Sequence, residues 1–346
     1  MGIKKAVACI KKYNNFLITA HTNLEGDALG SELAFCGLLK KMGKRAVIIN
    51  EDDLPYGYDF LPGTKNIKKF SRIRLLRRRC GIPYLSLIDG AGKKALKKHI
   101  RFDCFAALDC SDLGRTGEVY RLNADKKPVL NIDHHIGNQR FGDVNWVEPQ
   151  ASSCSEMIYK LYKKIRIPLD RDAAVLLYVG ILTDTGSFRY SNTTSFTHKA
   201  VSELLKHVFD IPRIYKNIYE NIPFSDMKLL SKILPEIRCC ASGKIAWLQI
   251  ERGILKNKKS SFDLTEHILG FARAIKGVEV VALFKENLGA KAEIRVNLRS
   301  QGKADVNRIA SFFGGGGHRT ASGATVSGRI DDVRRKVLAK IKESLR

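Results

Sequence analysis

Short apolar runs recur along the first part of the chain, and segments with helical periodicity lie between and after them. The runs are found at 16–20, 46–50, 104–109 and 128–133. Strands that are apolar along their whole length are buried on both faces, as in a parallel sheet covered by helices. Helices are predicted from about 28 to 42, from 153 to 164, from 171 to 182 and at intervals from 195 to 234. The pattern therefore predicts an α/β N-terminal domain with a mainly parallel sheet flanked by helices.

Strand signals return later in the chain and predict a second, smaller α+β domain. They lie at 244–250, 278–284 and 292–298, with helical stretches around Glu266 and Asp305. Pro223 and Pro235 bracket a predicted linker helix. A chain of 346 residues also exceeds the ~250 residues that one core usually supports. We expect a first domain over 1–208, linker helices over 209–235 and a second domain over 236–346.

The charge balance narrows the set of expected partners. The chain has 60 Lys and Arg against 35 Asp and Glu, which gives a formal charge of +25. Such an excess favours polyanionic ligands, with nucleic acids and nucleotides first among them. A general basic drift of composition would give the same charge without a specific partner. The densest basic run, KKFSRIRLLRRR at 68–79, is either a solvated face or an RNA contact, and both readings stay open.

The cysteines and the lack of a long apolar segment predict a cytoplasmic protein. None of the eight cysteines belongs to a Cys-x-x-Cys pair, and Cys104 and Cys110 lie in or beside an apolar run, as reduced buried thiols do. Lys11 and Lys12 interrupt the N-terminal stretch, which therefore does not resemble a signal peptide. No run approaches the ~18 apolar residues that a membrane span needs. We expect no membrane partner, and a homodimer is one of the oligomeric states left open.

Three polar clusters each follow an apolar strand. HTNLEGDALGS follows the run at 16–20, CSD follows 104–109, and a histidine pair follows 128–133. Ligands of open α/β sheets bind at the carboxyl ends of the strands, so these clusters should converge in one crevice. The candidate metal ligands in that crevice are His21, Glu25, Asp27, Asp109, His134 and Asp184.

Acidic and imidazole groups at this density would resist ionisation unless cations neutralise them. Mixed imidazole and carboxylate ligands suit Mn²⁺ better than Mg²⁺ or Ca²⁺, which prefer oxygen ligands alone. Two metal ions that share one carboxylate can hold a phosphate for in-line attack by water. We therefore predict two Mn²⁺ ions per chain, with Mg²⁺ or Co²⁺ as substitutes.

Each candidate ligand has a simpler explanation when it is taken alone. His21 could be a hydrogen-bonded loop residue, and Asp27 could stabilise a helix N-terminus. Asp109 could cap the turn before Gly114, and Asp184 could serve a turn. The coincidence of acids and histidines after three separate strands favours a metal site over these explanations.

The same clusters carry a resemblance to a known family. HTNLEGDALGS, ALDCSD, NIDHHIGN and TDTGSFRYSNT resemble, in this order, the four motifs of the DHH phosphoesterase superfamily. The stretch ADVNRIASFFGGGGHRTASGATV at 304–326 resembles the DHH-associated substrate-binding domain. Nearly the whole chain is covered, and the continuation DHHIGNQRFGDVNWVEPQASS is most similar to the nanoRNase and pAp-phosphatase group. The resemblance implies a catalytic DHH domain followed by a substrate-binding domain.

The resemblance also implies roles for individual residues. The first Mn²⁺ would bind His21, Glu25 and Asp109. The second would bind Asp27, Asp109, His134 and Asp184, so that Asp109 bridges the two ions. His135 would act as the general acid, and Asp133 would orient an imidazole.

Substrate would be held by Asn138 and by a second domain that closes over the crevice. In that domain the resemblance implies binding by Arg295, Arg299, Ser300, Gly315, Gly316, Gly317 and His318. On physical grounds, an arginine offers a planar fork for phosphate, and glycines let backbone amides approach it closely.

The first motif departs from the family pattern at one position. The family has Asp-x-Asp, whereas this chain has Glu25-Gly26-Asp27. The extra methylene of glutamate must fit into a ligand shell with a tolerance of about 0.2 Å. We expect weaker metal occupancy there, with activity reduced and not abolished.

The activity implied by the resemblance is metal-dependent hydrolysis of short oligoribonucleotides, from dinucleotides to about five-mers, to nucleoside 5'-monophosphates. Removal of a phosphate from adenosine 3',5'-bisphosphate is a second implied reaction. Three alternatives stay open: a cyclic dinucleotide phosphodiesterase, a RecJ-type single-strand exonuclease, and an RNA-binding protein whose metal site has weakened at Glu25. A pyrophosphatase is less favoured, because the glycine-rich region lacks that branch's Lys/Arg-rich anion clamp.

Overall fold

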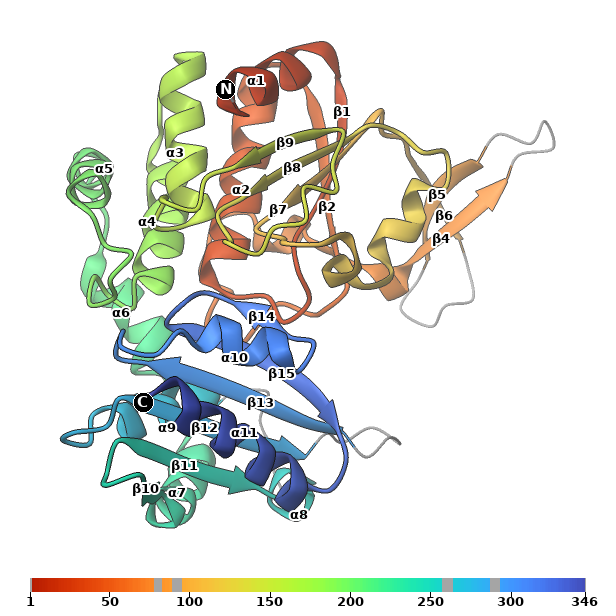
Figure 1. Cartoon of the computed structure of the whole chain (residues 1–346). Helices are drawn as coiled ribbons and strands as arrows, with labels where there is room; N and C mark the ends of the chain where they lie inside the picture. The colour runs from red at the N-terminus through yellow and green to blue at the C-terminus, as the bar shows by residue number, and fades with distance from the viewer. Residues whose placement is uncertain (1, 78–82, 89–94, 257–263, 287–292, 346) are drawn as a thin grey trace. The chain divides into compact units, whose positions relative to one another are not determined.

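The computed structural model describes residues 2–77, 83–88, 95–256, 264–286 and 293–345. The chain forms two compact units, Met1–Ile218 and Tyr219–Arg346 (Figure 1). The helix expected between Pro223 and Pro235 is α7 (Phe224–Ile233). Its Leu230 and Ile233 pack into the core of the second unit, so this helix belongs to that unit.

The first unit is built on a six-stranded sheet in which every pair of neighbouring strands is parallel. The predicted parallel α/β architecture is confirmed. In spatial order the strands are β3 (Lys68–Lys69), β2 (Arg45–Asn50), β1 (Asn15–Thr19), β7 (Cys104–Leu108), β8 (Val129–Asp133) and β9 (Val144–Val147). The central strands β1, β7 and β8 are almost entirely buried, as their continuous apolar sequences require.

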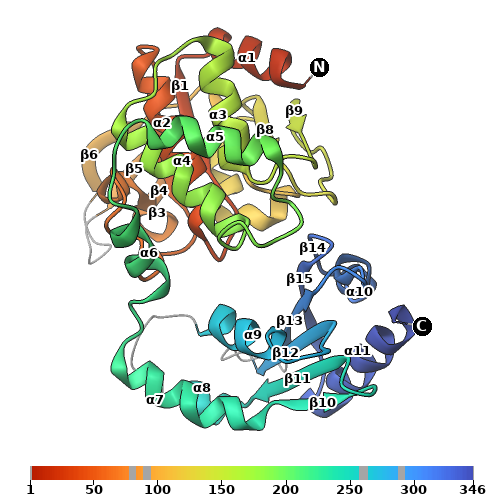
Figure 2. The ribbon, with the colours of Figure 1, turned by 90° about the vertical axis from the view of Figure 1, so that its left-hand side faces the viewer.

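Helices cover one face of this sheet, and Figure 2 shows α3, α4 and α5 on the side toward the viewer. The helices of the unit are α1 (Gly2–Lys12), α2 (Gly26–Lys41), α3 (Cys154–Ile165), α4 (Arg171–Asp184), α5 (Ser195–Leu205) and α6 (Ile211–Tyr219). Side-chain caps fix several of their starts: Ser153 accepts from the Glu156 amide, and Asp170 accepts from the Ala173 amide.

Helix α2 packs very closely against α4, and glycines make this approach possible. A Cβ on Gly26 would lie 2.5 Å from Thr183 Oγ1, and one on Gly30 would lie 2.4 Å from the Leu176 carbonyl oxygen. A Cβ on Gly180 of α4 would lie 2.0 Å from Ser155 Oγ and 2.7 Å from Asp27 Oδ1. The helix-to-helix distance therefore fixes where the acid at the start of α2 lies.

The opposite face of the sheet carries the irregular helix η3 (Leu113–Asn123), whose Val119 and Leu122 pack with Leu17 and Phe105. A separate small antiparallel sheet follows β3 in the chain. That sheet consists of β4 (Ile73–Arg77), β5 (Pro83–Ile88) and β6 (Ala95–Ile100). Short 3-10 turns η1 (Thr64–Asn66) and η2 (Phe70–Arg72) precede it. The basic run at 68–79 spans β3, η2 and β4, and its last two residues lie outside the described part of the chain.

The second unit is a mixed six-stranded sheet with helices on both faces, in agreement with the α+β prediction. In spatial order its strands are β10 (Arg238–Cys240), β11 (Ile245–Ile250), β12 (Val280–Glu286), β13 (Glu293–Ser300), β15 (Ala321–Ser327) and β14 (Gly316–Gly317). Its helices, besides α7 and the turn η4 (Leu234–Glu236), are α8 (Arg252–Lys256), α9 (Thr265–Arg273), α10 (Val306–Phe312) and α11 (Ile330–Ser344). One core joins α10 and α11 to one face, and another joins α7 and α9 to the other face.

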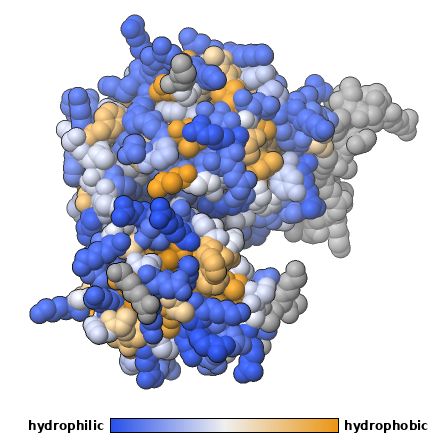
Figure 3. All heavy atoms as spheres, in the orientation of Figure 1, coloured by the Kyte–Doolittle hydropathy of each residue, from blue (hydrophilic) through white to orange (hydrophobic). Residues whose placement is uncertain are grey.

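The visible surface of both units is largely hydrophilic, with scattered apolar residues (Figure 3). Within the described residues, no helix combines the length and the apolar character needed to cross a bilayer. The cysteines of these residues are free thiols, and five of them are buried: Cys9, Cys36, Cys104, Cys110 and Cys154.

Candidate metal centre and active site

Acidic and imidazole side chains meet at the carboxyl ends of three neighbouring strands. His21 follows β1, Asp109 follows β7, and His134 follows β8. Two helix ends complete the group, because Asp27 lies in the first turn of α2 and Asp184 is the last residue of α4. The structure thus brings together all six residues that the sequence suggested as metal ligands, in two adjacent clusters.

The first cluster consists of His21, Glu25 and Asp109. His21 Nε2 lies 3.5 Å from Asp109 Oδ2 and 3.9 Å from Glu25 Oε1. His21 and Asp109 are buried, whereas the side chain of Glu25 is 55% exposed. Glu25 also occupies the N-cap position of α2 without capping it by a side-chain hydrogen bond. The residue that departs from the family pattern is therefore the solvent-facing member of its cluster.

The second cluster consists of Asp27, His134 and Asp184. His134 Nε2 lies 3.8 Å from Asp27 Oδ2 and 3.5 Å from Asp184 Oδ2. Asp27 is completely buried, and its two oxygens accept the backbone amides of Cys154 and Ser155 at 2.6 and 2.8 Å. The start of α3 thereby holds Asp27 in place and stabilises its negative charge.

Asp109 belongs to the first cluster and also faces the second. Its Oδ1 is 3.4 Å from His134 Nε2, while its Oδ2 is 3.5 Å from His21 Nε2. The residue is buried in a left-handed backbone conformation (φ 53°), which is unusual for a residue other than glycine. Within the described residues, neither of its oxygens has a hydrogen-bond partner, and the same holds for Asp184 Oδ2. Buried carboxylate oxygens without hydrogen bonds are costly unless a cation is coordinated there.

Backbone carbonyl groups orient both imidazoles toward the acids. His21 Nδ1 lies 2.7 Å from the Thr22 oxygen, and His134 Nδ1 lies 3.2 Å from the Ala151 oxygen. Each Nδ1 therefore carries the proton and donates it, which leaves the Nε2 lone pair directed at the carboxylates. This arrangement of a carbonyl behind each histidine is typical of metal-ligating imidazoles.

The pKa values of the acids in the centre reflect how many acidic groups are buried together. Burial raises the pKa of Asp27 to about 7, and the charge of Asp109 acts in the same direction. Burial likewise raises the pKa of Asp184 well above its usual value, although His134 opposes the shift. Burial also opposes ionisation of Asp109, yet the imidazoles of His134 and His21 hold its pKa well below the ordinary range. Acids with opposed shifts at such short distances are typical of a cation site.

The donor set fits divalent transition-metal ions. Two imidazole nitrogens and four carboxylates converge, and three of the carboxylate oxygens are buried without a hydrogen bond. A mixed nitrogen and oxygen set of this kind is suited to Mn²⁺, Fe²⁺, Co²⁺ or Zn²⁺. Asp109 could serve both clusters, because one of its oxygens faces each of them.

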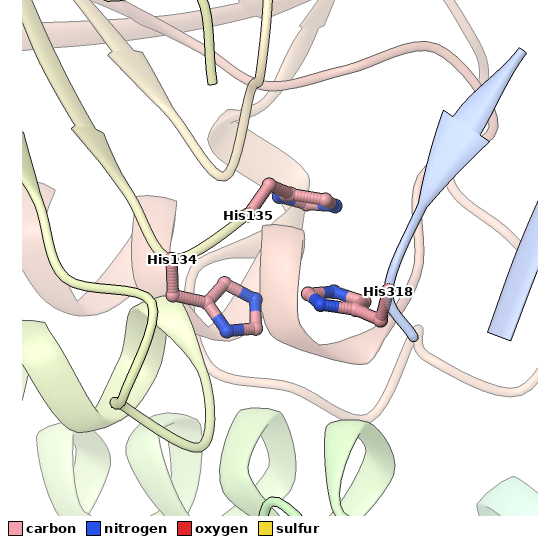
Figure 4. Close-up of side chains that lie close together, drawn as sticks. All are labelled: His134, His135 and His318. Atoms are coloured by element: carbon pink, nitrogen blue, oxygen red, sulfur yellow. The ribbon is translucent and has the colours of Figure 1, made fainter. Parts of the chain in front are cut away.

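A separate hydrogen-bond network holds the second histidine of the pair. Figure 4 shows His134 and His135 after β8, and their ring centroids are 5.1 Å apart. His135 Nδ1 lies 2.7 Å from Asp133 Oδ1, and Asn138 Nδ2 donates to Asp133 Oδ2 at 2.6 Å. Burial would raise the pKa of Asp133, but the charge and hydrogen bond of His135 outweigh it and bring the pKa to about 2. Asp133 is thus an ionised, fixed partner of His135, while Asn138 supports Asp133.

The second unit carries the other residues that were predicted to bind substrate, and several of their side chains form contacts within the unit. Arg295 and Arg299 lie on the more exposed side of β13, where Arg299 forms an ion pair with Glu266 and Arg295 donates to Thr325. Ser300 is buried on the opposite side of the strand, and its hydroxyl accepts from the Gly302 amide. The side chain of Ser300 therefore stabilises a turn.

The glycine run also has a structural role. A Cβ on Gly315 would lie 2.1 Å from the Gly323 oxygen, and one on Gly317 would lie 2.6 Å from the Ala321 oxygen. These two glycines permit the close pairing of the run with β15. Gly316 is different, since its nearest side-chain atom would be 3.9 Å away. His318, labelled in Figure 4, lies in the loop between β14 and β15.

Two side chains that bear on the site were not predicted from the sequence. Asn131 is buried in β8, where it donates to the Ala107 and Cys110 oxygens and accepts from Asn138. A polar residue inside an apolar strand was the available signal. Arg115 donates to Ser111, and its backbone oxygen accepts from the amide of Thr22, next to His21. Burial lowers the pKa of His21, but the hydrogen bond and charge of Asp109 raise it on balance, and the Arg115 charge opposes that rise.

Comparisons with known proteins cover both units. The model of the DHH family, N-terminal domain, matches residues 15–181, and that of the DHHA1 domain matches residues 255–346. A probable bifunctional oligoribonuclease and PAP phosphatase of Streptococcus mutans is 29% identical over 323 residues, 93% of either chain. The bifunctional oligoribonuclease and PAP phosphatase of Bacillus subtilis is 34% identical over 218 residues, 61% of this chain and 68% of the relative. The structure of an exopolyphosphatase-related protein from Bacteroides fragilis matches with a TM-score of 0.80 at 25% identity, covering 99% of this chain and 97% of that chain.

Proposed function

Because this chain belongs to the DHH family of metal-dependent phosphoesterases, we propose that it hydrolyses short oligoribonucleotides to nucleoside 5'-monophosphates. We propose removal of a phosphate from adenosine 3',5'-bisphosphate as its second reaction. Both activities are named for the Streptococcus mutans and Bacillus subtilis relatives. The observation that carries the proposal is Asp109, whose two buried oxygens each face a different ligand cluster.

The ligand roles follow from this position of Asp109. One Mn²⁺ would be held by His21, Glu25 and Asp109, and a second by Asp27, Asp109, His134 and Asp184. When bound, such ions neutralise phosphate charge and make water a stronger nucleophile near neutral pH. The backbone amides that hold Asp27 and the carbonyls behind the histidines preorganise these ligands before substrate arrives.

His135 is the proposed general acid. Asp133 accepts the hydrogen bond from Nδ1, which fixes the orientation of the ring. The Nε2 proton is then available to the leaving oxygen of the scissile phosphoester. Asn138 keeps Asp133 in place through Oδ2, so its proposed contribution is positioning, although substrate contact was expected for it. Arg115 is a cation near the first cluster that would offset the charge of the phosphate.

The second unit supplies the proposed recognition of the substrate. Arg295, Arg299 and Gly316 present cationic and backbone groups that suit phosphate, and such contacts carry no base sequence information. A site that recognises a chain end would favour substrates of two to about five nucleotides. A cytoplasmic location fits such substrates.

The test is a substrate panel with the purified full chain and Mn²⁺. The panel contains a linear diadenylate, adenosine 3',5'-bisphosphate, cyclic diadenylate and a single-stranded 30-mer. We expect release of AMP from the first two substrates, and slow or no turnover of the last two. Asp109→Ala should reduce the rate by at least about 10³-fold, because both metal clusters lose a shared ligand.

Each other result in the panel points to a different function. Preferential cleavage of cyclic diadenylate would indicate a cyclic dinucleotide phosphodiesterase, and rapid degradation of the 30-mer would indicate a RecJ-type exonuclease. RNA binding without hydrolysis or bound metal would indicate a binding protein. Unchanged rates for Asp109→Ala would contradict the shared-ligand assignment. Ser327→Ala, an exposed position of the second unit, is the matched control and should leave all rates unchanged.

A further inference from the structure

The sheet of the second unit has a polar face next to helix α9. Along β13 the residues alternate, and Ile294, Val296 and Leu298 enter the core beneath α10 and α11. Arg295, Asn297 and Arg299 point to the other side. There α9 covers β11 and β12 through a core that contains no residue of β13 or β15. Strand β13 therefore presents a row of polar side chains on this side, which begins with Glu293 and continues with two cationic residues and the neutral Asn297 between them.

Asn297 is the unexplained member of this row. Its side-chain oxygen is buried, and across the described parts of the chain it has no hydrogen-bond donor. In the register of the sheet its neighbours are Leu283 on β12 and Gly323 on β15, and neither has a side-chain group that could donate. An amide oxygen withdrawn from water without a donor is unfavourable unless a ligand provides one. The side-chain oxygen of Asn297, between the two arginines of the row, is thus available to a hydrogen-bond donor from a ligand.

The two arginines on either side are held in fixed positions. Arg299 forms an ion pair with Glu266, which lies in the first turn of α9. The guanidinium of Arg295 lies across β15 at Gly323, where an added Cβ would be only 3.0 Å from its Nη2. Along a strand, each arginine Cα is about 7 Å from the Cα of Asn297. Two fixed cations therefore flank one unsatisfied acceptor.

This spacing matches the chemistry of a nucleoside that carries phosphates at both its 3' and 5' positions. Guanidinium groups bind phosphates, and the group between the two phosphates of such a ligand is the ribose. The ribose of RNA has a 2'-hydroxyl that can both donate and accept a hydrogen bond, and DNA lacks it. A carboxamide side chain has the matching acceptor and donor.

We propose that Asn297 accepts a hydrogen bond from the 2'-hydroxyl of a ribonucleotide held between Arg295 and Arg299, so that the second unit selects RNA over DNA. The inference rests on the proposed function and adds the sugar specificity of that same substrate. Gly323 helps to keep Arg295 in this position, because a side chain at 323 would displace the Arg295 guanidinium.

The test measures binding without hydrolysis. Adenosine 3',5'-bisphosphate and its 2'-deoxy analogue are titrated by calorimetry into the metal-free full chain in EDTA. The wild type should bind the ribose form roughly five- to tenfold more tightly, which corresponds to one net hydrogen bond. Asn297→Ala should bring the two affinities within about twofold, with the affinity for the deoxy form unchanged. Ser327→Ala, at the far end of β15, should keep the wild-type ratio.

The ratio separates sugar recognition from other contacts. Equal loss of affinity for both ligands in Asn297→Ala would mean that the side chain contacts the base or a phosphate, and would overturn the proposal. A wild type that does not distinguish the two ligands, or that binds neither, would overturn it as well. Circular dichroism of the variant controls for folding. The proposed function fails by a different measurement, the absence of AMP release with Mn²⁺, and sugar selectivity in binding would survive that failure.

Discussion

Replacing Gly180 by alanine tests how strictly the packing of α2, α3 and α4 determines the metal centre. The new methyl group would lie 2.0 Å from Ser155 Oγ and 2.7 Å from both Ser155 Cβ and Asp27 Oδ1. Rotation of the Ser155 hydroxyl would relieve only the contact with its oxygen. Ser155 Cβ cannot rotate away, because it is bonded directly to the backbone. The Asp27 carboxylate is held by the amides of Cys154 and Ser155. The helices must therefore separate, or Asp27 must move.

The two parts of the effect have estimable sizes. Overpacking a buried contact costs about 1–3 kcal/mol, while alanine in place of glycine in a helix returns about 1 kcal/mol. A net loss of up to about 2 kcal/mol should lower the melting temperature by up to a few degrees for a unit of this size. The effect on the metal should be larger, because ligand positions tolerate only about 0.2 Å. We expect Mn²⁺ affinity to fall by about 10- to 100-fold, the range seen when a ligand's supporting contacts are removed.

Urea unfolding and Mn²⁺ titration of the wild type and two variants check both effects. Gly37→Ala, in α2 of the same unit, is the control, because its Cβ would meet only Tyr162 Oη at an ordinary 3.4 Å. It should match or slightly exceed the wild type in stability and should bind Mn²⁺ normally. A Gly180→Ala protein with wild-type Mn²⁺ affinity would refute the view that close helix packing positions Asp27.

Three further predictions concern single side chains of the centre. Glu25→Asp should strengthen Mn²⁺ binding several-fold in equilibrium titrations, because the shorter acid restores the family's ligand; weaker binding would show that the centre is adapted to glutamate. Asp133→Asn should lower kcat by about 10²- to 10⁴-fold while Mn²⁺ content stays constant, since it removes the ionised partner of His135 and no ligand; loss of metal would instead make Asp133 part of the metal site. The third is pH-dependent: protonated Asp27, with its pKa raised to about 7, stabilises the metal-free fold at low pH, and this contribution is lost as pH rises toward and through 7. Between pH 5 and 8 in EDTA, the melting temperature should therefore fall more steeply for the wild type than for Asp27→Asn. Parallel pH profiles of the two melting temperatures would contradict the raised pKa of Asp27.

The parts of the fold that could be predicted are those whose secondary structure is evident from the hydrophobic pattern of a single segment. The buried strands β1, β7 and β8 are mainly apolar on both faces, so both their existence and their parallel pairing followed from the sequence. Strands β9 and β15 were missed, because one has four residues and the other consists mainly of small residues. The antiparallel sheet of β4 to β6 was missed as well, since basic residues interrupt its apolar pattern.

The candidate site was predictable in its membership but not in its supporting contacts. His21, Asp109 and His134 could be grouped because each follows a strand, and parallel strands end at the same edge of a sheet. The hold of α3 on Asp27 is different, because it depends on helix packing that no single segment encodes. The same applies to Asn297, whose missing donor becomes visible only when its strand neighbours are known.

The order of the centre's residues along the chain has a consequence for biosynthesis. Residues from 21 to 184 must all be present before both clusters are complete, and they come from strands and helices that depend on one another's packing. A nascent chain that ends before the last turn of α4 carries histidines and acids but no complete second cluster. A chain that ends before Asp184 therefore lacks one proposed ligand, and retention of metal would report that α2, α3 and α4 have packed on the ends of the strands.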